Sequence, residues 1–257
     1  MQETLVVVPC YNEARRFDPA SFLAAAQADP SLGFLFVDDG SRDDTRAVLQ
    51  RLREQRPEQL SLLALDRNVG KAEAVRQGLH SAFERSPALV GYFDADLATP
   101  LQELAPMRAL FDEQTELVVA LGSRVGLLGR DVVRTHRRHY LGRVFASLAS
   151  LLLDLTVYDT QCGAKLLRNN AAVRGVFAEP FSVSWTFDVE VLARLAQLAR
   201  AGAIPPMSRA AVEYPLRRWR DVSGSKLGPA AALRAGKELA LLWHRYGHRY
   251  GQRYGQR

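Results

Sequence analysis

Cysteine is scarce in this 257-residue sequence, which contains only Cys10 and Cys162. Two cysteines so far apart exclude a disulfide framework and a cysteine-rich zinc site, and they are typical of a reduced, cytosolic chain. Long apolar runs are lacking as well. The most apolar segment, residues 144–158, is interrupted by Asp154 and is shorter than the roughly 18 residues that a spanning helix requires. Residues 1–4 lead into a strand-like run without a basic flank, so we expect no signal peptide.

Two common nucleotide-binding motifs are also missing. No Gly-x-Gly-x-x-Gly follows the first apolar run, which disfavours a dinucleotide-dependent dehydrogenase, and no Gly-x-x-x-x-Gly-Lys-Ser/Thr occurs, which disfavours a P-loop ATPase. The sequence does have an excess of positive charge, because 34 Lys and Arg against 28 Asp and Glu give a net charge of +6. This charge suits an anionic partner such as a nucleotide, a phospholipid surface, a polyprenyl phosphate or a nucleic acid.

The first half of the chain alternates short apolar runs with helical patterns. Buried strands are predicted at 5–9, 34–37, 60–65, 89–93 and 117–121, and helices at 19–28, 44–55, 71–86 and 100–112. Asp18 and Thr99 each precede a proline, as a capping residue does at the start of a helix. The alternation predicts an α/β fold with a mainly parallel sheet flanked by helices.

The second half has a different pattern. We expect helices at 144–155 and 187–201, a strand near 210–214, and a loop at 217–228. An amphipathic helix is predicted at 229–243, followed by a basic tail that repeats Arg-Tyr-Gly and is most simply a solvated segment. The chain is therefore divided into a main domain, residues 1–228, and a helix with its tail, residues 229–257.

Polar side chains follow four of the predicted strands at the point where each strand ends. They include Asn12, Glu13, Asp38, Asp39, Asp66, Asn68, Asp94 and Asp96. Because a parallel sheet binds its ligands outside the carboxyl ends of its strands, we expect a site at this edge. Asp94 and Asp96 lie on one side of an extended chain end and offer the hard oxygen ligands that suit Mg²⁺ or Mn²⁺ shared with a diphosphate. The residues alone favour a metal-bound nucleoside diphosphate as the ligand.

A succession of motifs resembles glycosyltransferase family 2, which has the GT-A fold, a Rossmann-like arrangement. The motifs are Val-Val-Pro-Cys-Tyr-Asn-Glu (7–13), Val-Asp-Asp-Gly-Ser-Arg-Asp-Asp-Thr (37–45), Asn-Val-Gly-Lys (68–71) and Asp-Ala-Asp (94–96). Asp-Leu-Ala-Thr-Pro (96–100), Gly-Ser-Arg (122–124), Asp-Thr-Gln-Cys-Gly-Ala-Lys (159–165) and Gly-Ser-Lys (224–226) narrow the likeness. With them the chain resembles the polyprenyl-phosphate glycosyltransferases, particularly the dolichyl-phosphate β-glucosyltransferases, and also the dolichyl-phosphate mannose synthases.

The resemblance implies roles for particular residues. Those implied to bind the nucleotide-sugar donor are Pro9, Tyr11, Glu13, Val37, Asp39, Lys71, Asp94, Ala95, Arg220 and Lys226, the last two from a loop that clamps its phosphates. Asp94 and Asp96 are implied to bind the metal, with Asp96 also catalytic. Asp159 matches a family carboxylate near the sugar, which orients the acceptor or acts as a base. Ala98 stands where mannose-type relatives often carry Gln, which favours glucose, whereas Ala164 replaces the aromatic residue usual in the glucose type.

The implied reaction transfers a hexose, with glucose from UDP-glucose favoured, to a polyprenyl phosphate. A phosphate monoester has a second pKa near ~6, so it is largely a dianion at neutral pH and attacks without a strong base. One in-line displacement inverts the anomeric centre. Arg124 and Arg138 are the expected contacts of the acceptor phosphate, because guanidinium forks match phosphate oxygens. The alternatives are a GDP-mannose donor and a soluble phosphorylated acceptor.

A basic stretch, residues 130–143, precedes the apolar helix at 144–155. This helix is interpreted as the part that receives the lipid at the cytoplasmic, inner face of the membrane; the competing interpretation is a buried core helix with a solvated basic flank. Membrane contact then comes from this surface or from a membrane partner protein. A basic module that binds RNA or anionic lipid through the Arg-Tyr-Gly tail is a further alternative, but the complete set of carboxylates speaks against it, and no nucleic-acid partner is expected.

Overall fold

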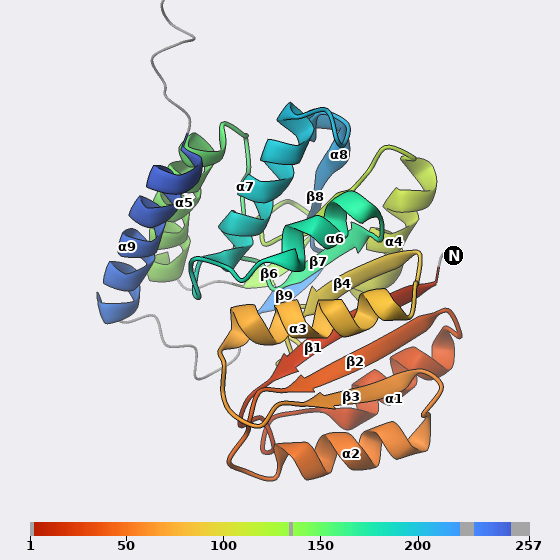
Figure 1. Ribbon diagram of the computed structural model, residues 1–257. Coiled ribbons are helices and arrows are strands. Elements are labelled where there is room, and N and C mark those ends of the chain that lie inside the picture. The colour runs from red at the N-terminus through yellow and green to blue at the C-terminus, as the bar shows by residue number, and fades with distance from the viewer. Residues whose placement is uncertain (1–2, 134–135, 222–228, 248–257) are drawn as a thin grey trace, which may run out of the picture.

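A computed structural model describes residues 3–133, 136–221 and 229–247 of the chain, with side chains described for all of these except 136–141, 229, 230 and 232. A mixed β-sheet crosses the molecule, and helices cover both of its faces (Figure 1). The strands are β1 (Thr4–Cys10), β2 (Leu32–Asp38), β3 (Leu60–Ala64), β4 (Leu89–Phe93), β5 (Val119–Ser123), β6 (Asp131–Val133), β7 (Ala164–Arg168), β8 (Ala211–Pro215) and β9 (Arg218–Arg220). The helices are α1 (Pro19–Ala28), α2 (Thr45–Gln55), α3 (Lys71–Glu84), α4 (Leu104–Glu113), α5 (His136–Leu153), α6 (Ala171–Ala178), α7 (Phe187–Arg200), α8 (Met207–Ala210) and α9 (Pro229–Tyr246), with a 3₁₀ turn η1 (Leu101–Glu103) before α4.

Within the described residues, seven strands form the main sheet in the order β3-β2-β1-β4-β7-β5-β8. All neighbours are parallel except those of β7, which runs antiparallel to β4 and to β5. The predicted α/β fold with a mainly parallel sheet is therefore confirmed. Because β1, β2 and β4 are parallel neighbours, the loops after Cys10, Asp38 and Phe93 emerge at one edge of the sheet. A separate pair of short strands, β6 and β9, joins two later loops.

The predicted elements of the first half match the structure closely. Helix α1 begins at Pro19, and the Asp18 carboxylate accepts hydrogen bonds from the amides of Ala20 and Ser21, which would otherwise lack a partner in the first turn. The main corrections fall later in the chain. Helix α5 begins at His136 rather than at residue 144, strand β7 was not predicted, and β9 lies inside the segment expected to be a loop.

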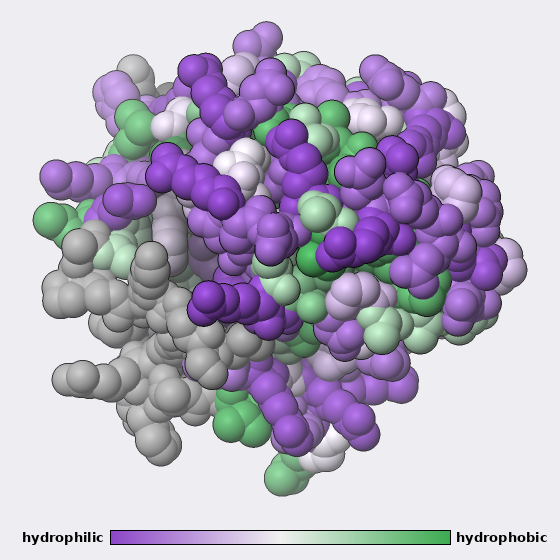
Figure 2. Space-filling view, turned by 90° about the horizontal axis from the view of Figure 1, so that it is seen from below, coloured by the Kyte–Doolittle hydropathy of each residue, from purple (hydrophilic) through white to green (hydrophobic). Residues whose placement is uncertain are grey.

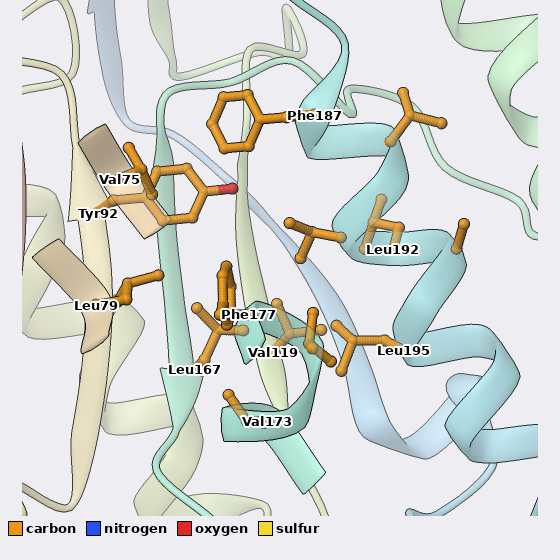
Figure 3. Close-up of a cluster of buried hydrophobic side chains, with 14 of the residues drawn as sticks. Val75, Leu79, Tyr92, Val119, Leu167, Val173, Phe177, Phe187, Leu192 and Leu195 are labelled. Atoms are coloured by element: carbon orange, nitrogen blue, oxygen red, sulfur yellow. The ribbon is translucent and has the colours of Figure 1, made fainter. Parts of the chain in front are cut away.

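Two hydrophobic clusters hold the sheet between its helices. One contains apolar residues of α3, α5, α6, α7 and α9, and the other contains those of α1, α2 and α4. Figure 3 shows part of the first cluster, where Val75 and Leu79 of α3 and Leu192 and Leu195 of α7 converge on the strands. Burying a side chain of this size contributes roughly 1.5–3 kcal/mol, so these layers hold the edge loops in place.

Helix α9 shares the first cluster, to which it contributes Leu239, Leu242 and Tyr246, and it packs beside α5 (Figure 1). Its Glu238 accepts hydrogen bonds from the amide of Trp185 at 3.0 Å and from the amide and hydroxyl of Thr186 at 2.8 and 2.9 Å, immediately before α7. The division of the chain at residue 228 stays a prediction. None of the helices within the described residues combines the length and the apolarity needed to cross a membrane.

Candidate active site

A cleft of about 400 Å³ lies at the edge of the sheet where β1, β2 and β4 end. Of the residues that the sequence assigns to the site, it brings together Pro9, Tyr11, Glu13, Asp39, Lys71, Asp94, Ala95 and Asp96. Asn68, which the sequence analysis expects at this edge without assigning it a role, also lines the cleft, and Cys10 and Gly70 complete the lining. Asn68 and Gly70 belong to the loop after the third strand, so the rule that collected the other residues at this edge also applies to them.

Asp39 fixes the floor of the cleft by holding the loop between β3 and α3. Its carboxylate accepts hydrogen bonds from the amides of Val69 at 2.6 Å and Gly70 at 3.0 Å and from the Asn68 side chain at 2.9 Å. Burial raises the pKa of Asp39, although the two amides oppose that effect. The neighbouring Gly40 has a φ of 62°, and a Cβ there would lie 2.3 Å from the carbonyl carbon of Arg67, so only glycine lets the loops approach this closely.

The carboxylates of Asp94 and Asp96 follow β4 directly. Lys71, the first residue of α3, places its Nζ 2.5 Å from Oδ1 of Asp94. Burial, together with the charge of Asp94, raises the pKa of Asp96 above its usual value. Burial opposes the positive charge of Lys71, but Asp94, Asp188 and Asp96 outweigh it and raise the Lys71 pKa. The cleft thus carries concentrated negative charge that the Lys71 ammonium partly balances.

This donor set fits a divalent cation. Among the described residues, no cluster of three or more His, Cys, Asp or Glu side chains is arranged to hold a metal ion. Asp94 and Asp96 would therefore hold one together with oxygens of a phosphate-bearing ligand, as Mg²⁺ and Mn²⁺ sites commonly do. The raised pKa of Asp96 is consistent with a carboxylate whose charge a bound cation would balance.

Gly163, immediately before β7, sets the position of Asp94. The Asp94 amide donates to the Gly163 carbonyl oxygen at 2.9 Å. A Cβ at Gly163 would lie 1.9 Å from Oδ2 of Asp94, so the carboxylate occupies the space that any other residue would fill. The sequence places this glycine in the Gln-Cys-Gly motif, but its contact with Asp94 depends on the antiparallel β7 and could not be foreseen.

Arg124 and Asp159 form a second polar group. The guanidinium donates to both oxygens of the Asp159 carboxylate, at 2.6 and 2.7 Å, and the Arg124 amide donates to Oδ2 at 3.0 Å. Glu213 of β8 in turn accepts from the amides of Tyr158 and Asp159, and Trp219 of β9 lies 5.3 Å from the guanidinium carbon. Burial works against the charge of Arg124, yet Asp159 and, more weakly, Cys162 and Asp94 raise its pKa. Arg124 directly follows β5, which runs in the same direction as β4, so this group lies at the same edge of the sheet as the cleft.

The remaining predicted site residues are placed differently. The side chain of Val37 is fully buried in the core beneath α3, where a Cβ at Gly78 would lie 2.7 Å from it, so that side chain cannot contact a ligand in the cleft. Arg220 is exposed on β9, where its guanidinium donates to Asp131 at 3.0 Å and its amide donates to Ala98. Lys226 lies outside the described residues. Arg138 belongs to α5, but its side chain also lies outside them.

Comparisons with known proteins agree with this geometry. Residues 5–174 match the family described as glycosyl transferase family 2. The chain is 34% identical over 259 residues to a dolichyl-phosphate beta-glucosyltransferase of Drosophila melanogaster, covering 95% of this chain and 75% of that protein. It is 25% identical over 190 residues to the polyprenol monophosphomannose synthase of Mycolicibacterium smegmatis, covering 74% of this chain and 71% of that one.

A solved structure shows the same architecture. The glucosyl-3-phosphoglycerate synthase of Mycobacterium tuberculosis, crystallised with Mn²⁺ and UDP-glucose, superposes with a TM-score of 0.61 at 18% identity, covering 95% of this chain and 79% of that one. This likeness confirms the GT-A fold. Because the family match spans well over half of the sequence and the identity to the Drosophila protein extends over nearly all of it, the chain belongs to glycosyl transferase family 2.

Proposed function

We propose that this protein transfers glucose from UDP-glucose to a polyprenyl phosphate, with inversion at the anomeric carbon. The observation that carries the proposal is the cleft in which Lys71, Asp94 and Asp96 converge, together with the Arg124–Asp159 pair that follows β5 at the same edge of the sheet. It offers a cationic and metal-binding side for a diphosphate and an arginine for a second phosphate. The relatives named as dolichyl-phosphate beta-glucosyltransferases, at 30–34% identity, support glucose and a polyprenyl acceptor.

On the donor side, the half-exposed ring of Tyr11 and the carboxylate of Asp39 lie where the nucleoside would bind, at the ends of β1 and β2. Asp94 and Asp96 would hold Mn²⁺ or Mg²⁺, which when bound supplies positive charge that stabilises the diphosphate leaving group. Lys71 adds a fixed ammonium beside the same position. Arg220 and Lys226 are proposed to contact the donor phosphates, which requires Arg220 to exchange its exposed pair with Asp131.

On the acceptor side, Arg124 and Arg138 are proposed to bind the phosphate. The Asp159 carboxylate holds Arg124 with both oxygens, so we assign to Asp159 the task of orienting that guanidinium. A dedicated base is not needed, because the phosphate monoester is already largely ionised at neutral pH. Its oxygen attacks the anomeric carbon, the bond to the diphosphate breaks, and one displacement inverts the centre.

The lipid is proposed to approach over α5. Val144, Leu148 and Leu151 recur at helical spacing, and 62%, 48% and 51% of their surfaces are exposed. Seen from below, by contrast, the surface is mostly hydrophilic, with hydrophobic residues in small separate patches (Figure 2). The α5 stripe is therefore our candidate for contact with the cytoplasmic face of a membrane, either directly or through a membrane partner protein.

The test is a transfer assay with radiolabelled UDP-glucose and GDP-mannose, each offered with polyprenyl phosphate in detergent and with 3-phosphoglycerate as a short acceptor. We expect a lipid-extractable β-glucoside that forms only with a divalent cation. Before that, UDP with Mn²⁺ at 100 times its dissociation constant should add about 2.7 kcal/mol to the stability, which is a rise of roughly 5–10 °C in Tm. Transfer from GDP-mannose, or equal transfer to the short acceptor, would contradict the proposal.

A further inference from the structure

A buried ion pair lies directly behind the cleft and is not part of it. Lys165 of β7 and Asp188 of α7 are 0% and 3% exposed, and the Lys165 ammonium donates to the Asp188 carboxylate at 2.6 Å. The Tyr92 hydroxyl donates to the same oxygen at 2.6 Å. In Figure 3 the Tyr92 side chain extends from the sheet with its hydroxyl toward the start of α7, near Phe187. Burying an ammonium is costly unless it is paired and hydrogen-bonded, so this arrangement calls for an explanation.

The register of the sheet connects the pair to Asp94. Tyr92 of β4 lies opposite Lys165 of β7 in the antiparallel ladder, and just beyond the end of β4 the Asp94 amide donates to the Gly163 carbonyl oxygen. Side chains two residues apart on a strand share a face. Tyr92 and Asp94 therefore project to the same side as Lys165, and Gly163 lies on that side beside the Asp94 carboxylate.

Lys165 also acts on the loop that Gly163 belongs to. Its ammonium donates to the Cys162 carbonyl at 2.7 Å, which is the peptide group immediately before Gly163. The Asp94 carboxylate occupies the space that a Cβ at Gly163 would fill, so any shift of this peptide changes where the carboxylate can lie. Asp188, Lys165 and the Cys162 carbonyl thus form a continuous connection from helix α7 to the Cys162–Gly163 peptide, which is the wall behind Asp94.

We propose that Lys165 is a positioning residue for the donor site: anchored by Asp188 and Tyr92, it holds the Cys162–Gly163 peptide against Asp94 and so fixes the carboxylate for metal and diphosphate binding. This rests on the proposed function. Lys165 does not touch the substrate. Its contribution is expected in the affinity for the metal–nucleotide complex and not in contacts to the nucleoside.

A second buried group, which likewise combines a cation, a carboxylate and a tyrosine hydroxyl, provides a matched control. Arg194 and Glu190 of α7 form an ion pair at 2.8 Å, and the Tyr246 hydroxyl donates to Glu190 at 2.9 Å. This group ties α7 to α9 and to the end of α6, through the carbonyls of Val176 and Glu179, and none of its three residues lines the cleft. Replacing it disturbs a buried ion pair on the same helix without touching the wall behind Asp94.

The experiment measures Mn²⁺ and UDP binding by calorimetry in the full chain carrying Lys165→Met with Asp188→Asn, a pair that leaves no uncompensated buried charge. We expect the Mn²⁺ dissociation constant in the presence of UDP to rise at least tenfold, while UDP binding in EDTA stays within twofold of wild type. Arg194→Met with Glu190→Gln should lower Tm but leave the Mn²⁺ constant unchanged.

Tyr92→Phe serves as the milder variant, because it removes a single hydroxyl and keeps the ion pair. Here we expect a rise of about threefold in the Mn²⁺ constant. A wild-type Mn²⁺ constant in either folded variant, or an equal loss in the Arg194 control, would overturn the positioning role. Failure of the wild-type chain to bind UDP with Mn²⁺ would instead refute the proposed function, so the two failures are distinguishable.

Discussion

Replacing Gly163 by alanine tests whether the proposed donor site depends on the exact position of Asp94. The added Cβ would lie 1.9 Å from Oδ2 and 2.2 Å from Cγ of Asp94, whereas ordinary contacts begin at 3.4 Å. The carboxylate must therefore move by about 1.5 Å, which separates it from the Lys71 ammonium now 2.5 Å away. Misplacing a catalytic group by ~1 Å can cost about 100-fold in rate, so we expect kcat/KM for transfer to fall by at least that factor.

The assay compares kcat/KM and Tm for Gly163→Ala and for Gly175→Ala, a helical position in α6 where an added Cβ meets nothing within 4 Å. Overpacking at Gly163 should also cost about 1–3 kcal/mol of stability, whereas the change at Gly175 should be neutral or add up to ~1 kcal/mol. Wild-type activity in a folded Gly163→Ala protein would refute the reasoning, because it would mean that the position of Asp94 is not critical.

Three further predictions concern the metal, the acceptor and the membrane. Burial and Asp94 raise the Asp96 pKa above 3.8, so protonated Asp96 stabilises the metal-free fold, and this stability is lost as pH rises through the raised pKa. When the free energy of unfolding in urea is measured against pH, Asp96→Asn should flatten that part of the curve, and it should also abolish Mn²⁺-dependent UDP binding. A curve that Asp96→Asn leaves unchanged would contradict the assignment. Arg124→Lys should raise the KM for polyprenyl phosphate about tenfold (~1.4 kcal/mol) and leave the KM for UDP-glucose unchanged. Arg209→Lys, in the exposed pair with Glu116, should change neither constant. A rise in the KM for UDP-glucose instead would count against an acceptor role for Arg124. Leu148→Ser with Leu151→Ser should reduce cosedimentation with anionic vesicles about tenfold. Leu128→Ser, at a fully exposed position outside the α5 stripe, should leave it unchanged. Equal vesicle binding by all forms would exclude the stripe as the membrane contact.

The part of the site that was predicted from sequence depends on one regularity. Parallel strands deliver their carboxyl ends to one edge, so Asp39, Asp94 and Asp96 could be brought together from the ends of apolar runs alone. Val37 was carried over from the family motif, and its side chain lies in the core because successive residues of a strand point to opposite faces. The roles assigned to these residues remain predictions.

The parts that were not predicted depend on long-range pairing. Strand β7, Ala-Lys-Leu-Leu-Arg, carries a lysine at a fully buried position, so its apolar pattern is too short and too interrupted to indicate a strand. Its burial makes sense only with Asp188, which comes 23 residues later. Helix α5 was started too late for a related reason, because the basic residues after 136 lack the apolar periodicity used to recognise a helix.

The hydrogen bonds of Glu238 have a consequence for the order of folding during synthesis. This residue of α9 holds the amides of Trp185 and Thr186, which precede the helix that carries Asp188. The sheet can form while the ribosome is still extending the chain, since every strand among the described residues precedes residue 221. The start of α7 acquires its final set of partners only after α9 has emerged from the exit tunnel. A nascent chain stalled before α9 should therefore contain the sheet but lack the hydrogen bonds that Glu238 makes at the start of α7, the helix that carries Asp188.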